Sequence, residues 1–157
     1  MQNRIIDEID YKIIEQLQDD ARISHSVLAE KIGMPVSTVR DRVKRLEQRG
    51  VIKGYTAVVN AEAMGKSIMA FIRLSIGTTS RNYIEAKAEV ARICQVEPDI
   101  LECHGVAGED CYVLKVRAPT PVGLEKLLER IRSQAEVSKS VTNIVLTTVK
   151  ENIKIVP

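Results

Sequence analysis

The first part of the chain carries a helical pattern of hydrophobic residues. Aliphatic side chains recur at the spacing of one helix face, at Ile9, Ile13, Ile14 and Leu17. Asp7 stands before this pattern as a candidate N-cap. Asp10 places a negative charge in the first turn, where the helix dipole favours it. The pattern predicts a first helix that begins near Asp7 and ends near Asp19.

Two more helical patterns follow in close succession. The second begins after Ser24, a candidate N-cap, and Gly33 ends it. The third is ended by Gly50 and carries an apolar stripe of Val36, Val39, Val43 and Leu46. Ala29 lies four residues before Gly33. Because a small residue lets two helices approach closely and glycine suits the turn, this spacing predicts a helix-turn-helix.

The second half of the chain mixes strand patterns with helical ones. We expect strands at 67–76, 100–106, 111–117 and 141–150, and helices at 82–94 and from Thr120-Pro121 onward. The order βαββαβ is that of a ferredoxin-like sandwich, with helices on one face of an antiparallel sheet. The predicted fold class is therefore α+β, with an N-terminal three-helix (winged) helix-turn-helix domain followed by this sandwich.

These patterns divide the chain into two domains. We expect a helix-turn-helix domain over 1–60, a linker over 61–66 and the ferredoxin-like domain over 67–157. Residues 51–60 are expected to form a short strand pair or a strand leading outward, as a wing or linker. The tail 151–157 keeps alternating, which suggests that it packs on, or exchanges with, a neighbour.

Composition and cysteine usage narrow the class of protein. Hydrophobic residues make up 45% and charged residues 28%, which is typical of a globular chain. No apolar run approaches the roughly 20 residues of a membrane span, and the start lacks a signal-peptide pattern, so we expect a cytoplasmic location. Cys94, Cys103 and Cys111 have no metal-ligand spacing. We expect three structural thiols, no metal and no cofactor.

The distribution of charge changes the picture more than the net value of +2 does. The stretch 36–53 holds six basic residues and two acidic ones, whereas 1–35 holds four basic and seven acidic. A local excess of this kind attracts polyanions. Charge alone would also fit a solvated helix face, but the excess coincides with the third helix of the helix-turn-helix and thus indicates double-stranded DNA as a partner.

The outer face of the third helix supplies the candidate DNA contacts. Near its N-terminus we expect base contacts from Ser37, Thr38, Arg40 and Asp41. Further along we expect phosphate contacts from Lys44, Arg45 and Arg49. Arg42 lies nearer the buried flank, and two roles stay open for it: packing against the first helix, or contact with DNA.

The first strand of the second domain indicates self-association. Its alternation places Ala70, Ile72, Leu74 and Ile76 on one face and Met69, Phe71, Arg73 and Ser75 on the other. Since the two helices cover only one face of the sheet, the other face keeps more apolar surface than a monomer normally leaves wet. We expect a homo-oligomer that pairs through this second face.

Taken together, these residues resemble the Lrp/AsnC (leucine-responsive, or feast/famine) family of transcriptional regulators. The resemblance is carried by the stretches 5–10, 20–24, 28–33, 37–39, 42–47 and 50–55, and it extends to the C-terminal end. One departure lies at Met34-Pro35-Val36-Ser37, where family members often have Leu-Ser-Pro-Ser. Met34 cannot cap a helix through a side-chain oxygen, so the start of the third helix is less defined by the sequence. The resemblance implies dimers that pair through their sheets and assemble into tetramers or octamers.

The resemblance also implies an effector site between dimers for an amino acid or a related metabolite. In the family this site lies near the hairpin after the second strand and the start of the last strand, and a Gly-x-x-Asp run is typical there. Here Cys111 takes the usual Asp position, with carboxylates at Glu109 and Asp110 instead. The implied effector residues are Gly108, Asp110, Cys111, Thr142 and Asn143. The effector is an amino acid, another small molecule, or none.

Two rival functions stay open. Siroheme decarboxylases resemble the same architecture, but they would need convergent basic and imidazole groups, and this chain has only His25 and His104. No nucleophile triad or phosphate loop is present in the sequence, so we expect a protein that is not an enzyme. The second rival is an architectural protein that wraps DNA with little sequence preference.

Overall fold

A computed structural model describes residues 6–77, 83–152 and 154–155. The chain divides into two compact units, the first made of Met1–Val58 with Lys150–Pro157 and the second of Val59–Val149. The division after Val58 lies close to the expected linker at 61–66. The end of the chain, which the sequence suggested would pack on a neighbour, groups with the first unit instead of the second.

The first unit contains the three expected helices: α1 (Glu8–Asp19), α2 (His25–Ile32) and α3 (Val36–Gln48). Asp7 caps α1 in a reciprocal capping box with Asp10, and Ser24 caps α2. Gly33 ends α2 in the left-handed conformation, with φ of 74°, a backbone region that favours glycine. The helices bury one apolar cluster, formed by Ile13, Leu28, Ala29, Val39, Val43 and Leu46.

The ends of α3 differ from those of the other two helices. Pro35 occupies its N-cap and no side chain caps it, as expected from the Met34-Pro35 departure. The residues after α3 form no strand in this single chain: 53–60 are extended and largely exposed, although a strand or strand pair was expected. An isolated extended segment has no neighbouring strand to accept its backbone hydrogen bonds, so periodicity alone does not make it a strand.

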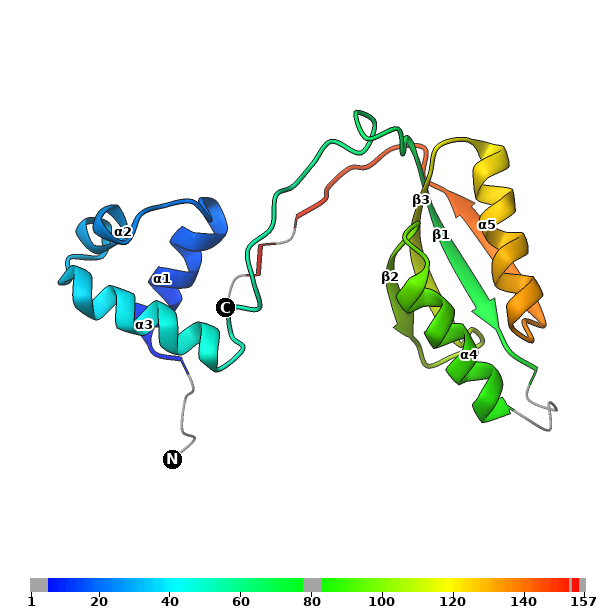
Figure 1. The fold of residues 1–157 in the computed structure, drawn as a ribbon, viewed down its shortest axis with the longest axis horizontal. Helices are drawn as coiled ribbons and strands as arrows, with labels where there is room; N and C mark the ends of the chain where they lie inside the picture. The colour runs from blue at the N-terminus through cyan, green and yellow to red at the C-terminus, as the bar shows by residue number, and fades with distance from the viewer. Residues whose placement is uncertain (1–5, 78–82, 153, 156–157) are drawn as a thin grey trace. The chain divides into compact units, whose positions relative to one another are not determined.

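The second unit has the expected βαββαβ order. It comprises β1 (Ile68–Ser75), α4 (Tyr83–Val96), β2 (Ile100–Gly105), β3 (Tyr112–Ala118), α5 (Pro121–Gln134) and β4 (Lys139–Ile144). The strands lie in the order β2-β3-β1-β4, and the paired strands are antiparallel. Both helices lie on one face of the sheet (Figure 1). This topology confirms the ferredoxin-like sandwich.

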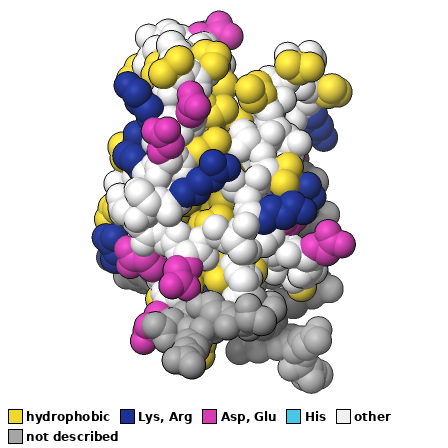
Figure 2. All heavy atoms as spheres, turned by 90° about the vertical axis from the view of Figure 1, so that its right-hand side faces the viewer, with side chains coloured by type: hydrophobic (Ala, Val, Ile, Leu, Met, Phe, Trp, Pro, Cys, Tyr) yellow, Lys and Arg dark blue, Asp and Glu magenta, His cyan; other side chains and the backbone are white. Residues whose placement is uncertain are grey.

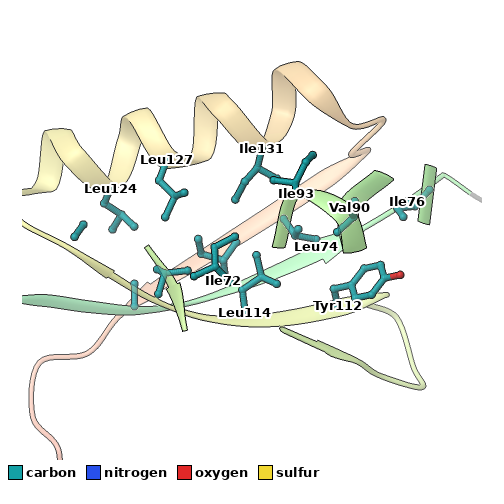
Figure 3. Packing of buried hydrophobic residues seen from close by; sticks show 14 of the residues in the cluster. Ile72, Leu74, Ile76, Val90, Ile93, Tyr112, Leu114, Leu124, Leu127 and Ile131 are labelled. Carbon is teal, nitrogen blue, oxygen red and sulfur yellow. The ribbon is translucent and has the colours of Figure 1, made fainter. Parts of the chain in front are cut away.

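The core of the second unit lies between that sheet face and the helices. Leu124, Leu127 and Ile131 point from α5 toward the sheet, where Ile72 and Leu114 lie (Figure 3). Ile72 and Leu114 face each other across the β1–β3 pair and are fully buried. The alternation expected for β1 is confirmed at Ala70, Ile72 and Leu74, and Ile76, which follows the strand, is buried as well. Met69 departs from it: we expected it on the uncovered face, but it is only 8% exposed.

The last strand is shorter than the sequence suggested. We expected it to reach residue 150, but β4 ends at Ile144, opposite Ala70 of β1. One more backbone bond, from the Val145 amide to the Met69 carbonyl, continues the pairing. Because β1 itself begins at Ile68, the chain beyond Val145 soon has no strand to pair with, even though its sequence keeps alternating.

We expect Leu114→Ala to lower the free energy of unfolding by about 2–5 kcal/mol, because it removes methyl groups from a fully buried position and leaves a cavity. Urea unfolding followed by circular dichroism measures the change. Leu101→Ala, at a position 53% exposed on the neighbouring β2, is the matched control and should change the value by less than about 0.5 kcal/mol. Equal losses for both variants would contradict this location of the core.

Candidate nucleic-acid interface and effector site

The outer face of α3 presents most of the predicted DNA-contacting residues to solvent. Ser37, Arg40, Asp41, Lys44 and Arg49 are exposed, whereas Thr38 is half-buried. Within the described part of the chain, no side-chain hydrogen bond or ion pair engages Arg40, Asp41 or Lys44. These groups are therefore available to a ligand without first breaking an internal contact.

The inner flank of α3 is held to α1 by a buried carboxylate. Asp10 is 1% exposed, and it accepts hydrogen bonds from Arg42 Nη1 at 2.8 Å and from Arg45 Nη2 at 2.9 Å and 3.0 Å. Arg42 also binds Asp7, at 2.6 Å. Two guanidinium groups thus compensate one buried charge, which would otherwise be costly to keep out of water.

This ion cluster, made of Asp7, Asp10, Arg42 and Arg45, shows what Arg42 and Arg45 contact within the chain. Of the two roles open to Arg42, the structure displays packing against the first helix. Arg45, for which we predicted a phosphate contact, is half-buried and directs its guanidinium to Asp10. Sequence reasoning missed these pairings because the partners lie 32 and 35 residues apart, beyond any local spacing.

The ion cluster also shifts the pKa values of two of its members, Asp7 and Arg42. The hydrogen bond from Arg42 lowers the pKa of Asp7 from its usual 3.8, helped by the Asp10 backbone amide. Asp7 and Asp10 in turn raise the pKa of Arg42. Asp7 therefore serves both as the N-cap of α1 and as an ion-pair partner of α3.

The charge on α3 differs from that on the face drawn in Figure 2. In that view Lys and Arg side chains are intermingled with Asp and Glu, and hydrophobic side chains lie between them. A mixed surface of this kind produces no strong field of one sign. By contrast, four of the exposed or half-buried predicted DNA contacts on and just after α3 are basic: Arg40, Lys44, Arg45 and Arg49.

Three of the predicted effector residues lie together in the turn that joins β2 to β3. Gly108 adopts φ of 137°, which a side chain would rarely tolerate. Asp110 accepts a hydrogen bond from Ser75 Oγ at 3.3 Å and pairs with Arg73 at 3.5 Å. The Sγ atom of Cys111 accepts from the Ile76 amide at 3.4 Å. The carboxylate is thus anchored to the end of β1.

Thr142 and Asn143 do not converge with that turn within one chain. Thr142 pairs with Ile72 and therefore points to the helix-covered face, whereas Asn143 pairs with Phe71 and points to the opposite face. Ser75, which contacts Asp110, lies three residues further along β1 than Ile72, roughly 10 Å away. Sequence reasoning missed Ser75 and Arg73 as partners of Asp110, although their alternation had already placed them on one face.

A cavity of about 680 Å³ lies in the first unit, and none of the predicted effector residues lines it. Its lining includes apolar residues of α1, such as Ile14 and Leu17, and of the segment after α3, such as Ile52 and Val58. Lys154 and Ile155 border it. Ile155 exchanges two hydrogen bonds with the Gln18 side chain, at 2.7 Å and 2.9 Å. The end of the chain is thereby attached to α1.

In the described residues, no group of three or more His, Cys, Asp or Glu side chains is arranged to hold a metal ion. None of the helices in the described ranges is long and apolar enough to cross a membrane.

The sequence matches two family models that together cover most of its length. Residues 6–53 match a family described as winged helix-turn-helix DNA-binding. Residues 69–155 match the Lrp/AsnC ligand binding domain. The two matches correspond to the helix-turn-helix and to the ferredoxin-like sandwich, respectively.

Curated relatives match over nearly the whole chain. The HTH-type transcriptional regulator LrpA of Mycobacterium tuberculosis is 40% identical over 146 residues, which cover 93% of each chain. The leucine-responsive regulatory protein of Escherichia coli is 32% identical over 152 residues, covering 96% of this chain and 91% of the relative.

Solved structures agree with the fold. The feast or famine regulatory protein of M. tuberculosis, in complex with L-methionine, matches with a TM-score of 0.85 at 38% identity, over 96% of this chain and 99% of that one. A transcriptional regulator of Neisseria meningitidis, also in complex with L-methionine, matches with a TM-score of 0.87 at 26% identity, over 96% of each chain.

We expect the stability of the protein to depend on Asp7 in acid. Because the pKa of Asp7 is lowered in the folded state, its contribution is complete above its usual value of 3.8 and is lost as the pH falls through the lower folded value. Asp7→Asn keeps an amide oxygen that can cap α1 but removes the charge, so unfolding should depend less on pH below about 5.

Urea unfolding by circular dichroism at a series of pH values measures this dependence. Asp41→Asn is the matched control, since Asp41 is exposed on α3 and has no ion-pair partner in the described part of the chain. It should leave the acid limb of the profile unchanged. An Asp7→Asn profile that coincides with the parent profile would contradict the role of the Asp7–Arg42 pair.

Proposed function

This chain belongs to the Lrp/AsnC family of transcriptional regulators, and from that premise we propose that it reads specific sites on double-stranded DNA and adjusts its binding to a small metabolite, an amino acid in the first place. The observation that carries the DNA-reading part is the outer face of α3. Arg40, Asp41 and Lys44 are exposed there and make no internal ion pair within the described residues.

The position of these residues along α3 divides their tasks. Ser37, Thr38, Arg40 and Asp41 lie in its first turns, and the N-terminal part of a recognition helix is the part that meets base edges in the major groove. Lys44 and Arg49 lie further along and contact phosphates, which position the protein without reading sequence. The Arg45 guanidinium binds Asp10 in this structure. A phosphate contact by Arg45 would therefore share this guanidinium with Asp10 or replace the bond to Asp10.

An amino acid is the favoured effector class because two solved relatives hold L-methionine. In this chain the proposed contacts are Gly108, Asp110 and Cys111 of the β2–β3 turn, with Thr142 and Asn143 of β4. Thr142 and Asn143 point to opposite faces of the sheet and lie several residues along β1 from Ser75, which holds the turn, so the proposal places the effector between copies of the protein. An ammonium group is matched by the Asp110 carboxylate, which is already fixed by Ser75 and Arg73.

Self-assembly is the third part of the proposal. The sheet face that carries no helix bears Phe71, 39% exposed, at the centre of β1. On the same face, Val113 of β3 and Val141 of β4 are the cross-strand neighbours of Arg73, one on each side of β1. Covering this apolar surface with a second copy gives a dimer, and dimers assemble further into the tetramers or octamers implied by the family resemblance.

We further propose that the protein acts by binding rather than by catalysis, and that it does so in the cytoplasm, where chromosomal DNA is accessible. The relatives described above carry the names of transcriptional regulators. The imidazole groups do not support a catalytic role either: His104 is exposed on β2 and contacts Glu102, and His25 begins α2.

We expect Arg40→Ala to weaken binding to a preferred site by about 1–3 kcal/mol, with a smaller effect on random DNA, because it removes a base contact. Lys44→Ala should weaken binding to both DNAs alike and lower the salt dependence by about one counterion. Fluorescence anisotropy measures both, using DNA from upstream of the protein's own coding region beside random DNA at two salt concentrations.

The matched control is Lys126→Ala, which removes an exposed positive charge from α5 and should leave both affinities unchanged. Equal losses on specific and random DNA for Arg40→Ala and Lys44→Ala would refute base reading and favour the architectural role. Repeating the titration with a pool of amino acids tests the effector part, because a ligand that prefers one state shifts the binding curve.

Phe71→Asp should reduce the mass of the particle in sedimentation, because a carboxylate at the centre of the uncovered sheet face opposes its burial against a second copy. Val122→Asp is the matched control, since Val122 is 58% exposed in the first turn of α5, where an acid is tolerated. An unchanged mass for Phe71→Asp would exclude this face as the interface.

A further inference from the structure

Arg45 lies at the border between the inner flank and the outer face of α3. Arg42, three residues earlier, is on the inner flank, and Asp41, four residues earlier, is exposed on the outer face. Because residues three and four apart are neighbours on a helix surface, Arg45 adjoins both. Its side chain is 40% exposed, compared with 19% for Arg42. Of the two guanidinium groups in the ion cluster, that of Arg45 is therefore the more accessible to an external ligand.

The attachment of Arg45 to the ion cluster is incomplete. A single nitrogen, Nη2, contacts both oxygens of Asp10, at 2.9 Å and 3.0 Å. The Nε atom of Arg45 is buried and has no hydrogen-bond partner in the described part of the chain. A buried donor without an acceptor costs free energy, and a guanidinium is able to bind one anion through two nitrogens at once. Arg45 thus leaves part of its hydrogen-bonding capacity unused.

Asp10 remains compensated without Arg45. Its Oδ1 accepts from Arg42 Nη1 at 2.8 Å, and its Oδ2 accepts from the Asp7 amide at 3.3 Å. If Arg45 turns away, each carboxylate oxygen keeps a donor and the buried charge keeps a cation. Arg42 also binds the Asp7 carboxylate, so two carboxylates hold Arg42, whereas one holds Arg45. Arg45 is therefore the member of the ion cluster that is most easily released.

We propose that Arg45 is a switch residue, which rests on Asp10 in the free protein and moves to a DNA phosphate in the complex, while Arg42 keeps Asp10 compensated. The inference rests on the proposed DNA-binding function and specifies how one of its contacts is made. A phosphate accepts two guanidinium nitrogens, so it matches Arg45 better than the single-nitrogen contact with Asp10 does. Rotation of the side chain toward the phosphate also allows the buried Nε–H to find an acceptor.

The exchange makes Asp10 a positioning residue for DNA binding, although Asp10 itself is buried. Because the contact with Asp10 has to be broken before Arg45 binds a phosphate, this carboxylate weakens the binding of DNA. Arg42 has the opposite effect. Without Arg42, Asp10 would depend on Arg45 for compensation of its buried charge, and Arg45 would be retained there.

The first test measures how salt weakens the binding of the full-length protein to a random-sequence DNA duplex, by fluorescence anisotropy. One phosphate contact contributes about 0.9 to the slope of log K against log salt concentration. Arg45→Gln, which keeps an amide donor but no charge, should lose about this amount, whereas Arg45→Lys should retain most of it. Lys12→Gln removes an exposed positive charge from α1 of the same unit and is the matched control, with the parent's slope expected.

Two outcomes of this test would overturn the switch. An Arg45→Gln slope equal to that of the parent would mean that Arg45 stays on Asp10 in the complex. An Arg45→Lys slope as low as that of Arg45→Gln would mean that the charge at this position does not act on a phosphate. A parent protein that binds no DNA at all would overturn the proposed function, and the switch with it, which differs from a parent that binds DNA while Arg45 stays on Asp10.

The second test compares two carboxylates of the ion cluster. Asp10→Asn and Asp7→Asn each raise the net charge by one, so their general attraction to DNA increases alike. Asp10→Asn also removes the carboxylate that holds Arg45, and it should therefore tighten binding about two- to fivefold more than Asp7→Asn does, the range of a partly exposed ion pair. Equal affinities of the two variants would overturn the exchange.

Circular dichroism of each variant checks that the helices are retained. Asp10 is buried, so Asp10→Asn is the variant most exposed to loss of the fold. If it unfolds, the salt slopes of Arg45→Gln and Arg45→Lys decide the question, because Arg45 is half-buried at the surface of α3 and both replacements are polar side chains that α-helices accommodate.

Discussion

The carboxylate of Asp10 is the constraint on which the first unit depends. It is almost completely excluded from water, yet two guanidinium groups of α3 bind it, and Arg42 extends the cluster to the cap of α1. A buried ion pair of this kind is specific more than it is stabilising, because any other packing of α3 on α1 would leave a charge unpaired. The cluster thus fixes which face of α3 is turned outward, and that face carries the candidate DNA contacts.

In the second unit, the element on which the rest of the structure depends is the strand β1. It is hydrogen-bonded to β3 on one side and to β4 on the other, so its alternation is transmitted to both neighbours. One of its faces forms the core with α4 and α5, and the other presents Phe71 and Arg73. Its end also holds the β2–β3 turn, through Ser75 and Asp110. A single strand therefore positions the core, the proposed interface and part of the proposed effector site.

The arrangement separates the tasks of the protein physically. DNA reading is assigned to exposed, uncommitted side chains on a helix whose other flank is locked by ions. Under the proposed function, effector recognition falls to the β2–β3 turn and the edge strand β4, and the proposed site is completed by a second copy of the chain. The chain passes between the two units twice, since the residues after β4 return to the first unit, where Ile155 binds Gln18.

The sequence by itself determined the elements and their order. Helical and alternating periodicities, caps such as Ser24 and Thr120, and Gly33 at its turn are local signals, and they specified three helices followed by βαββαβ. Tertiary structure alone decided the partners of Asp10, the departure of Arg45 from a purely outward position and the end of β4 at Ile144. The physical reason is that sequence patterns are local. Periodicity tells which face of its element a side chain occupies, whereas the distant residue that it contacts depends on how the elements pack.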